Sequence, residues 1–168
     1  SATQNGDLAI AGSGGSVVIN NNGLVRGTMD FTGISVATNN VTVNNNASAF
    51  WYTAGASTFG AGNDVFNNNA GATFSATSNA TLAGLERINN AGTITLANNN
   101  TTDRIDAAGS AYVSSGAATI NLDAFLGAGA GQSGCTAAVA ADCVVLGASS
   151  GSGTIIAVSD TNAAGPGA

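Results

Sequence analysis

Short runs of asparagine recur at a nearly constant interval through the first hundred residues. Each run follows a short β-branched or aromatic segment, and the steps from Asn20 to Asn44, Asn67 and Asn89 are 24, 23 and 22 residues. Such a period predicts a solenoid of stacked coils, because one strand-turn unit is too small to bury its apolar face alone. The runs comprise Asn20, Asn21, Asn22, Asn44, Asn45, Asn46, Asn67, Asn68, Asn69, Asn89 and Asn90.

We interpret these asparagines as turn and stacking residues. Asparagine tolerates the left-handed backbone of tight turns, and its side-chain amide can hydrogen-bond to a copy of itself in the next coil. The runs are therefore expected to mark the turns between stacked coils rather than a functional surface.

The composition predicts an all-β chain with very little helix. Hydrophobic residues make up 44% of the 168 residues and alternate with polar ones, as in residues 93–96 and 119–122. Twenty-four glycines, 21 asparagines and one proline fit many tight turns between short strands. Apolar residues recur with the period of strands, and no window shows the 3.6-residue period of a helix.

The charge pattern argues against two classes of partner. The net charge is −6, lysine and histidine are absent, and the three arginines (Arg26, Arg87 and Arg104) are dispersed. Binding to nucleic acid or to an anionic membrane surface needs several basic side chains on one face, so neither is expected. No stretch is long and apolar enough to cross a bilayer, and we interpret the chain as a segment of a longer precursor.

Asparagine content divides the chain into two regions of one continuous stack. Eighteen of the 21 asparagines lie between Asn20 and Asn100, and the remainder of the chain is richer in alanine, glycine and serine. Residues 1–100 are predicted to form coils with Asn-rich turns, and residues 101–168 a C-terminal region that caps the open edge. Longer strands are expected in that region, at residues 103–107, 111–114, 118–122, 144–147 and 153–158.

The two cysteines, Cys135 and Cys143, are eight residues apart in a Gly/Ala-rich segment. A zinc site would need at least two more donors than this segment offers, so no metal is expected there. A local disulfide is favoured over two free thiols and would indicate an oxidising compartment.

Motifs for metal binding or catalysis are sparse. Residues 60–66 (GAGNDVF) are similar to one unit of a calcium-binding β-roll, but such a site needs carboxylates from consecutive units, so a plain turn is favoured. Asp103 and Asp106 are the only closely spaced acids with a nearby arginine, and a spacing of three puts them on opposite faces of a strand. We therefore expect no enzyme activity, no cofactor and no metal.

The aromatic cluster Phe50-Trp51-Tyr52 is expected to lie in a strand, with Trp51 on one face and its two neighbours on the other. Core packing of Trp51 is favoured, because a large aromatic in a chain with 5% aromatics usually fills space. The alternative is that Trp51 forms an exposed binding surface for a glycan or a protein.

The second half of the chain resembles the C-terminal part of the passenger region of bacterial autotransporters. The resemblance rests on the order and spacing of several pieces, and the repeat units upstream are also similar to passenger repeats. The pieces are residues 82–94 (LAGLERINNAGTI), 103–105 (DRI), 112–113 (YV), 118–127 (ATINLDAFLG), 142–147 (DCVVLG), 152–158 (SGTIIAV) and 164–168 (AGPGA).

This resemblance implies a right-handed parallel β-helix whose last coils act as an autochaperone, folding first and templating the rest. It further implies export to the bacterial cell surface through the protein's own outer-membrane β-barrel translocator. Residues 118–122 and 154–158 are expected to belong to the most stable part of the stack.

The leading functional hypothesis is thus a non-catalytic surface stalk with an autochaperone cap, with adhesion as an additional role. The first alternative is an adhesin module that binds a host glycan or protein, or another copy of itself. A β-helical carbohydrate-active enzyme and an ice-binding solenoid are less favoured alternatives, because the catalytic groups are sparse and the Thr-x-Thr pattern is sporadic.

Overall fold

The computed structural model describes residues 4–124 and 141–161. All helical or strand elements assigned within these residues are β-strands, and none is a helix. The first eight strands are β1 (Leu8–Ser13), β2 (Val17–Asn21), β3 (Leu24–Arg26), β4 (Thr28–Gly33), β5 (Val41–Asn45), β6 (Phe50–Thr58), β7 (Val65–Asn68) and β8 (Thr73–Ala83). The remaining strands are β9 (Arg87–Asn90), β10 (Thr93–Thr95), β11 (Arg104–Ala107), β12 (Ala111–Ser114), β13 (Thr119–Ala124), β14 (Cys143–Leu146), β15 (Ser149–Gly151) and β16 (Ile155–Asp160).

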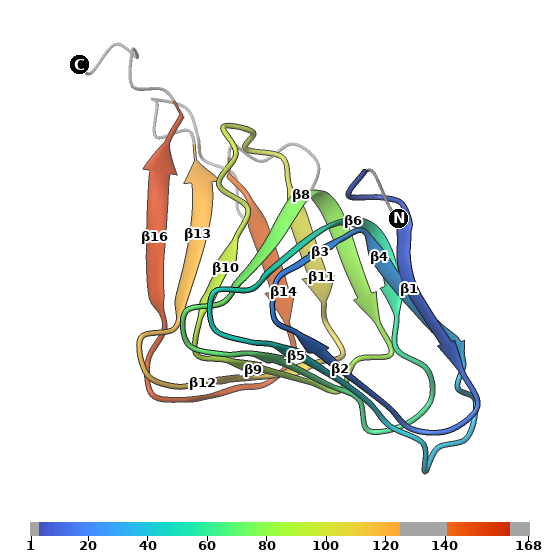
Figure 1. Cartoon of the computed structure of the whole chain (residues 1–168). Helices are drawn as coiled ribbons and strands as arrows, with labels where there is room; N and C mark the ends of the chain where they lie inside the picture. The colour runs from blue at the N-terminus through green and yellow to red at the C-terminus, as the bar shows by residue number, and fades with distance from the viewer. Residues whose placement is uncertain (1–3, 125–140, 162–168) are drawn as a thin grey trace.

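The strands stack as a parallel β-solenoid of about 5 turns, which confirms the predicted fold class (Figure 1). One sheet runs in the order β15-β12-β9-β7-β5-β2, so that each strand lies beside its counterpart in the neighbouring coil. The other sheet holds the remaining strands, and its long strands β6 and β8 each serve two positions in a coil. The first half of β8 pairs with β10, and its second half pairs with β11.

Strand pairing continues without a break across residue 100. Strands β8, β9 and β10, which precede that residue, pair in parallel with β11, β12 and β13, which follow it. The expectation of longer strands after residue 103 is wrong. Strands β6 and β8 have 9 and 11 residues, whereas β11, β12 and β14 have 4 each. The long strands arise because the chain continues from one side of the coil to the next with only a local bulge, near Gly55 in β6 (φ +83°).

Inward side chains of successive coils stack into continuous columns. The parallel register places Trp51, Phe74, Ile94 and Ile120 in one column. A second column contains Val43, Phe66, Ile88 and Tyr112. All of these side chains are buried. Each added coil therefore removes apolar surface from water, at about 25 cal/mol per Å², while the parallel ladder satisfies the backbone.

Both ends of the described stack expose apolar side chains. Ile156 continues the column of Ile120 but is 54% exposed, and its neighbours Ile155 and Val158 are 60% and 52% exposed. The apolar side chains of Ile155, Ile156 and Val158 are therefore not part of the buried core. The reason is position: within the described residues no further strand pairs with the outer edge of β16.

Gly60 makes the turn that the 60–66 motif predicts between β6 and β7. Its φ of +100° lies in the region that favours glycine, and a Cβ at this position would lie 2.8 Å from the carbonyl oxygen of Ile34 in the preceding coil. The motif thus contributes close coil-to-coil packing.

Candidate functional site

Four asparagines form a buried hydrogen-bonded ladder along the solenoid. The side-chain amide nitrogen of each donates to the side-chain oxygen of the next, at 2.8 Å from Asn21 to Asn45, 3.0 Å from Asn45 to Asn68 and 2.8 Å from Asn68 to Asn90. Asn45, Asn68 and Asn90 are 0% exposed. Because a buried amide without partners would be costly, this continuous pairing allows polar side chains to occupy the interior.

The same amides tie together the two sheets. In Asn21, Asn45 and Asn68 the second hydrogen of the side-chain nitrogen goes to a backbone carbonyl at the start of a strand in the following coil. Asn21 donates to Phe50 O at 2.9 Å, and Asn45 donates to Thr73 O at 2.9 Å. Because a carbonyl accepts and cannot donate, these bonds fix which way the amide group points. The ladder therefore holds the corner between the six-stranded sheet and the next turn of the larger one.

Two outer ladders run beside the buried one in the opposite sense. Here the later coil donates to the earlier one: Asn44 to Asn20 at 2.8 Å, Asn67 to Asn44 at 2.7 Å and Asn89 to Asn67 at 2.8 Å. The third members of the runs do the same, from Asn46 to Asn22 at 2.8 Å and from Asn69 to Asn46 at 2.9 Å. The first two asparagines of each run end a strand, and only Asn22, Asn46 and Asn69 lie beyond it. Parallel backbone pairing continues through the first two, so they stack as strand residues.

Tyr112 ends the buried ladder, a role that the sequence reasoning missed. Its phenolic oxygen accepts a hydrogen bond from the Asn90 side chain at 3.0 Å and lies 3.1 Å from Thr154 Oγ1. Tyr112 is 22 residues after Asn90, so extending the asparagine period by one step would have identified it.

Trp51 does not form a binding surface. The side chain is 1% exposed, and its ring centroid lies 5.1 Å from Phe66 and 4.7 Å from Phe74. Its indole nitrogen donates to Gly27 O at 2.9 Å. The alternative of an exposed contact at Trp51 is therefore wrong, because strand alternation directs this residue inward.

The neighbours of Trp51 face solvent instead, as strand alternation predicts. Phe50 is 41% exposed, and its ring lies parallel to that of Tyr52, with centroids 5.9 Å apart and an interplanar angle of 2°. The Arg26 guanidinium lies 5.2 Å from the Tyr52 ring centroid, and Leu24 beside Phe50 is 58% exposed. These four side chains form what we call the aromatic patch.

Three buried aspartates meet where the C-terminal coils join the stack. The Asp142 carboxylate accepts hydrogen bonds from the backbone nitrogens of Asp103 (3.1 Å) and Asp123 (2.8 Å). Asp103 in turn accepts from the side chains of Asn98 (2.6 Å) and Asn100 (2.8 Å). Burial raises the pKa of Asp142 to about 6, and the charges of Asp103 and Asp123 add to this effect against the two backbone hydrogen bonds. The Asp142 carboxylate thus joins the residues that precede β11 and β14 to the end of β13.

Asp64, the acid of the 60–66 motif, has a similar structural role. Its Oδ1 accepts the backbone N–H of Val41 at 2.6 Å, and its own N–H donates to Glu86 Oε2 at 2.7 Å. Oδ2 is buried without a hydrogen-bond partner in the described structure. Burial raises the pKa of Asp64, with a further contribution from the Glu86 charge. Across the described ranges, no group of three His, Cys, Asp or Glu side chains is placed to hold a metal ion.

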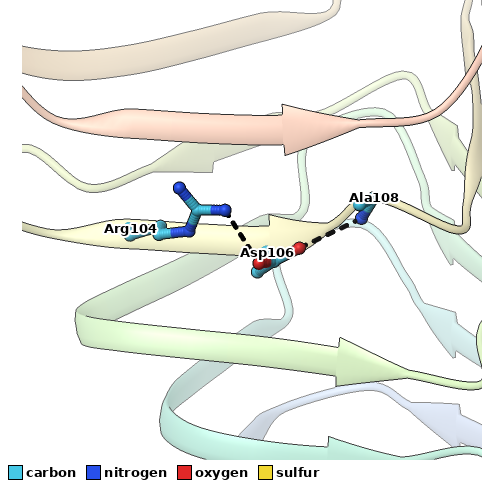
Figure 2. Close-up of polar contacts among 3 residues, drawn as sticks. All are labelled: Arg104, Asp106 and Ala108. Carbon is cyan, nitrogen blue, oxygen red and sulfur yellow. Dashed lines mark hydrogen bonds and ion pairs between the residues drawn. The ribbon is translucent and has the colours of Figure 1, made fainter. Parts of the chain in front are cut away.

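Asp106 and Asp103, the acids considered for catalysis, are separated as their spacing predicts. Asp103 is buried and 4% exposed, whereas Asp106 lies outward on β11. There Asp106 pairs with Arg104 at 2.8 Å and accepts the backbone N–H of Ala108 at 3.2 Å (Figure 2). The hydrogen bond from Arg104 lowers the pKa of Asp106.

Cys143 begins β14, but Cys135 lies outside the described residues, so their disulfide stays a prediction.

The fold defines a parallel β-solenoid, and comparisons with known proteins add no closer relationship. The chain matches no protein-family model, no curated protein and no solved structure. In the described parts of the chain, no helix is long and apolar enough to span a membrane.

Proposed function

We propose that this chain is a non-catalytic segment of a surface-displayed β-helical stalk, of the kind found in autotransporter passengers. In this proposal the segment is exported through the protein's own outer-membrane β-barrel to the bacterial cell surface. Residues 101–168 serve as an autochaperone on which the preceding coils fold.

The observation that carries the proposal is the unbroken parallel register across residue 100. Strands β11, β12 and β13 present three edges, and each pairs with the corresponding strand of the coil before it, β8, β9 and β10. A preformed C-terminal coil would therefore offer every backbone partner that the next coil needs, which makes sequential coil addition physically simple. Tyr112 in such a coil would also offer the hydrogen-bond acceptor for Asn90, the ladder asparagine nearest to the C-terminal region.

Three of the buried or strand-borne acids, Asp103, Asp106 and Asp142, have structural partners, which supports a scaffold role. The carboxylates of Asp103 and Asp142 hold backbone or asparagine groups, and Asp106 is paired with Arg104. These bonds stabilise coil contacts, which supports a structural role for the three acids.

Limited proteolysis of the whole chain in partial denaturant tests the order of folding. Under the proposal, the last fragment to resist cleavage contains the C-terminal coils, because these fold first and unfold last. Recovery of an N-terminal resistant fragment would contradict the autochaperone assignment.

Surface display tests the export role with a matched pair of variants. The chain is placed upstream of an autotransporter β-barrel in a Gram-negative host, and protease resistance at the cell surface is measured. Ile120→Ala removes a buried side chain from the C-terminal region, and Ile94→Ala removes one from the same column before residue 100. Each costs about 2 to 5 kcal/mol. Ile120→Ala should abolish resistance of the whole segment, whereas Ile94→Ala should leave a resistant C-terminal fragment. Equal effects would refute templating.

A further inference from the structure

The outward rows of one solenoid face change chemistry along the stack. In the parallel register of β3, β6, β8, β10 and β13, one row contains Leu24, Phe50, Thr73, Thr93 and Thr119. The adjacent row contains Arg26, Tyr52, Ser75, Thr95 and Asn121. Strands β8, β10 and β13 thus carry small polar residues at these positions, and the Phe50 row returns to an apolar residue only at Ile155 of β16, at the end of the described stack. The solenoid does not need large side chains there, so the aromatic patch is not explained by folding.

The patch is also held in a defined arrangement. Arg26 Nη1 donates to Asn5 Oδ1 at 2.8 Å, and Asn5 in turn donates to Thr77 Oγ1 at 2.7 Å. The guanidinium is therefore fixed against the Tyr52 ring, whose parallel neighbour is Phe50. Since β6 is paired on both sides, by β3 and β8, the patch stands on a rigid surface. Such pre-organisation lowers the entropic cost of binding.

From this geometry we propose that Leu24, Arg26, Phe50 and Tyr52 form a binding site for a neutral saccharide. Aromatic rings offer apolar surface to the C–H faces of a sugar, and a guanidinium has five N–H donors, one of which is used by Asn5. Four side chains expose on the order of a few hundred Å², well below the ~800 Å² that each partner gives to a stable protein interface. A small ligand with an apolar face and many acceptors fits this patch better than a protein.

Charge selects a neutral ligand over an acidic one. The chain carries a net charge of −6, and Arg26 is one of only three basic residues. Acidic polysaccharides are attracted by clusters of basic side chains, and the patch contains one cation already engaged by an aromatic ring and an amide. Binding should therefore depend little on ionic strength. This inference goes beyond the proposed function, because a stalk needs no ligand.

The test is an NMR titration of the full chain with neutral oligosaccharides built from glucose, galactose, mannose or N-acetylglucosamine. Heparin serves as the acidic comparison. We expect at least one neutral oligosaccharide to shift the amide signals of the aromatic patch saturably, with little change between about 50 and 500 mM salt. No shift at the patch with any neutral sugar up to about 10 mM would overturn the proposal. Salt-sensitive binding of heparin alone at the patch would also overturn it.

Two variants localise the binding without disturbing the fold. Phe50→Thr and Tyr52→Ser install the residues that the following coil carries at the same positions, Thr73 and Ser75. Each should weaken binding at least tenfold while thermal unfolding stays cooperative. Ile155→Thr, in the Phe50 row at the far end of the stack, should bind like the parent. Unchanged affinity in both patch variants would sink the assignment, and it would leave the stalk proposal untouched.

Discussion

The side chain of Asn90 donates a hydrogen bond to the phenolic oxygen of Tyr112 at 3.0 Å, one coil further along the chain. A column of stacked amides must end somewhere, and its last member needs an acceptor that does not itself require another amide. A buried tyrosine hydroxyl meets this need, because it accepts from Asn90 and exchanges a second hydrogen bond with Thr154. The ladder thus ends with a tyrosine in place of an asparagine, and Tyr112 follows Asn90 at the spacing of the repeat.

Replacing Tyr112 with Phe should destabilise the fold by about 1 to 2 kcal/mol, because a buried amide hydrogen of Asn90 loses its acceptor. Urea denaturation followed by circular dichroism measures the free energy of unfolding. Thr154→Val removes the other, less buried hydroxyl and should cost under about 0.5 kcal/mol. If both variants lost the same stability, Tyr112 would not be the end of the ladder.

Neighbouring asparagines should differ sharply in their contribution to stability. Asn68→Ala removes the buried bonds with Asn45, Asn90 and Thr93 O, and should cost about 2 to 4 kcal/mol. Asn67→Ala removes only outer-ladder bonds that compete with water, and should cost about 0.5 to 1 kcal/mol. Chemical denaturation of the two variants in parallel gives the difference. Equal losses would show that burial does not distinguish the two ladders.

Trp51→Ala should cost about 3 to 5 kcal/mol, because a large buried ring is lost from the column between Val25 and Phe74. The native protein should show tryptophan emission at short wavelength that shifts to the red on unfolding, since Trp51 is its only tryptophan. Emission typical of an exposed indole in the folded protein would contradict the buried position.

Stability should decrease as the pH rises from about 4 to 6. The pKa of Asp142 is about 6 in the folded protein against an ordinary value of 3.8, so between these values the folded state binds a proton that the unfolded state has released. Protonation therefore favours folding, and ionisation of Asp142 beside Asp103 and Asp123 removes this stabilisation as the pH rises through about 6. Asp64, whose pKa is also raised, acts in the same direction.

The variant Asp142→Asn separates the contribution of Asp142 to the pH dependence of stability from the contributions of the other acids. The variant keeps a side-chain oxygen for one backbone N–H but cannot ionise, so most of the change in melting temperature between pH 4 and 6 should disappear. The part due to Asp64 should remain. Asp106, whose pKa is lowered, affects stability only below about pH 4, outside this window. A variant with the parent's full pH dependence would exclude Asp142 as its source.

The asparagine period predicted the stacked coils of the fold. The features that the sequence did not predict have physical explanations. Alternation of apolar and polar residues identified the inward positions, and alternation placed Trp51 opposite Phe50 and Tyr52. The sequence did not predict the long strands β6 and β8. A strand that bends through a bulge has the same sequence pattern as two strands with a turn between them. Ile156 is exposed although it continues an inward column, because an inward position is buried only when another coil covers it.

The candidate site was harder to predict because it depends on neighbours that are far apart in sequence. Asn5, Arg26 and Tyr52 are brought together by coil stacking, and their separations in the chain carry no motif. Likewise, Asp103, Asp123 and Asp142 each look isolated in the sequence, and coil stacking brings the residues before β11 and β14 next to the end of β13. Tyr112 was the exception, since its distance from Asn90 repeats the period.

The opposed directions of the amide ladders bear on how long such a stack can grow. A single column of aligned amides would build up a dipole with every coil, much as peptide groups do along a helix. Here the buried column points its donors towards later coils, and the outer columns point theirs towards earlier coils. The buried column offsets part of the dipole of the two outer columns, so a coil adds less net dipole than three aligned columns would.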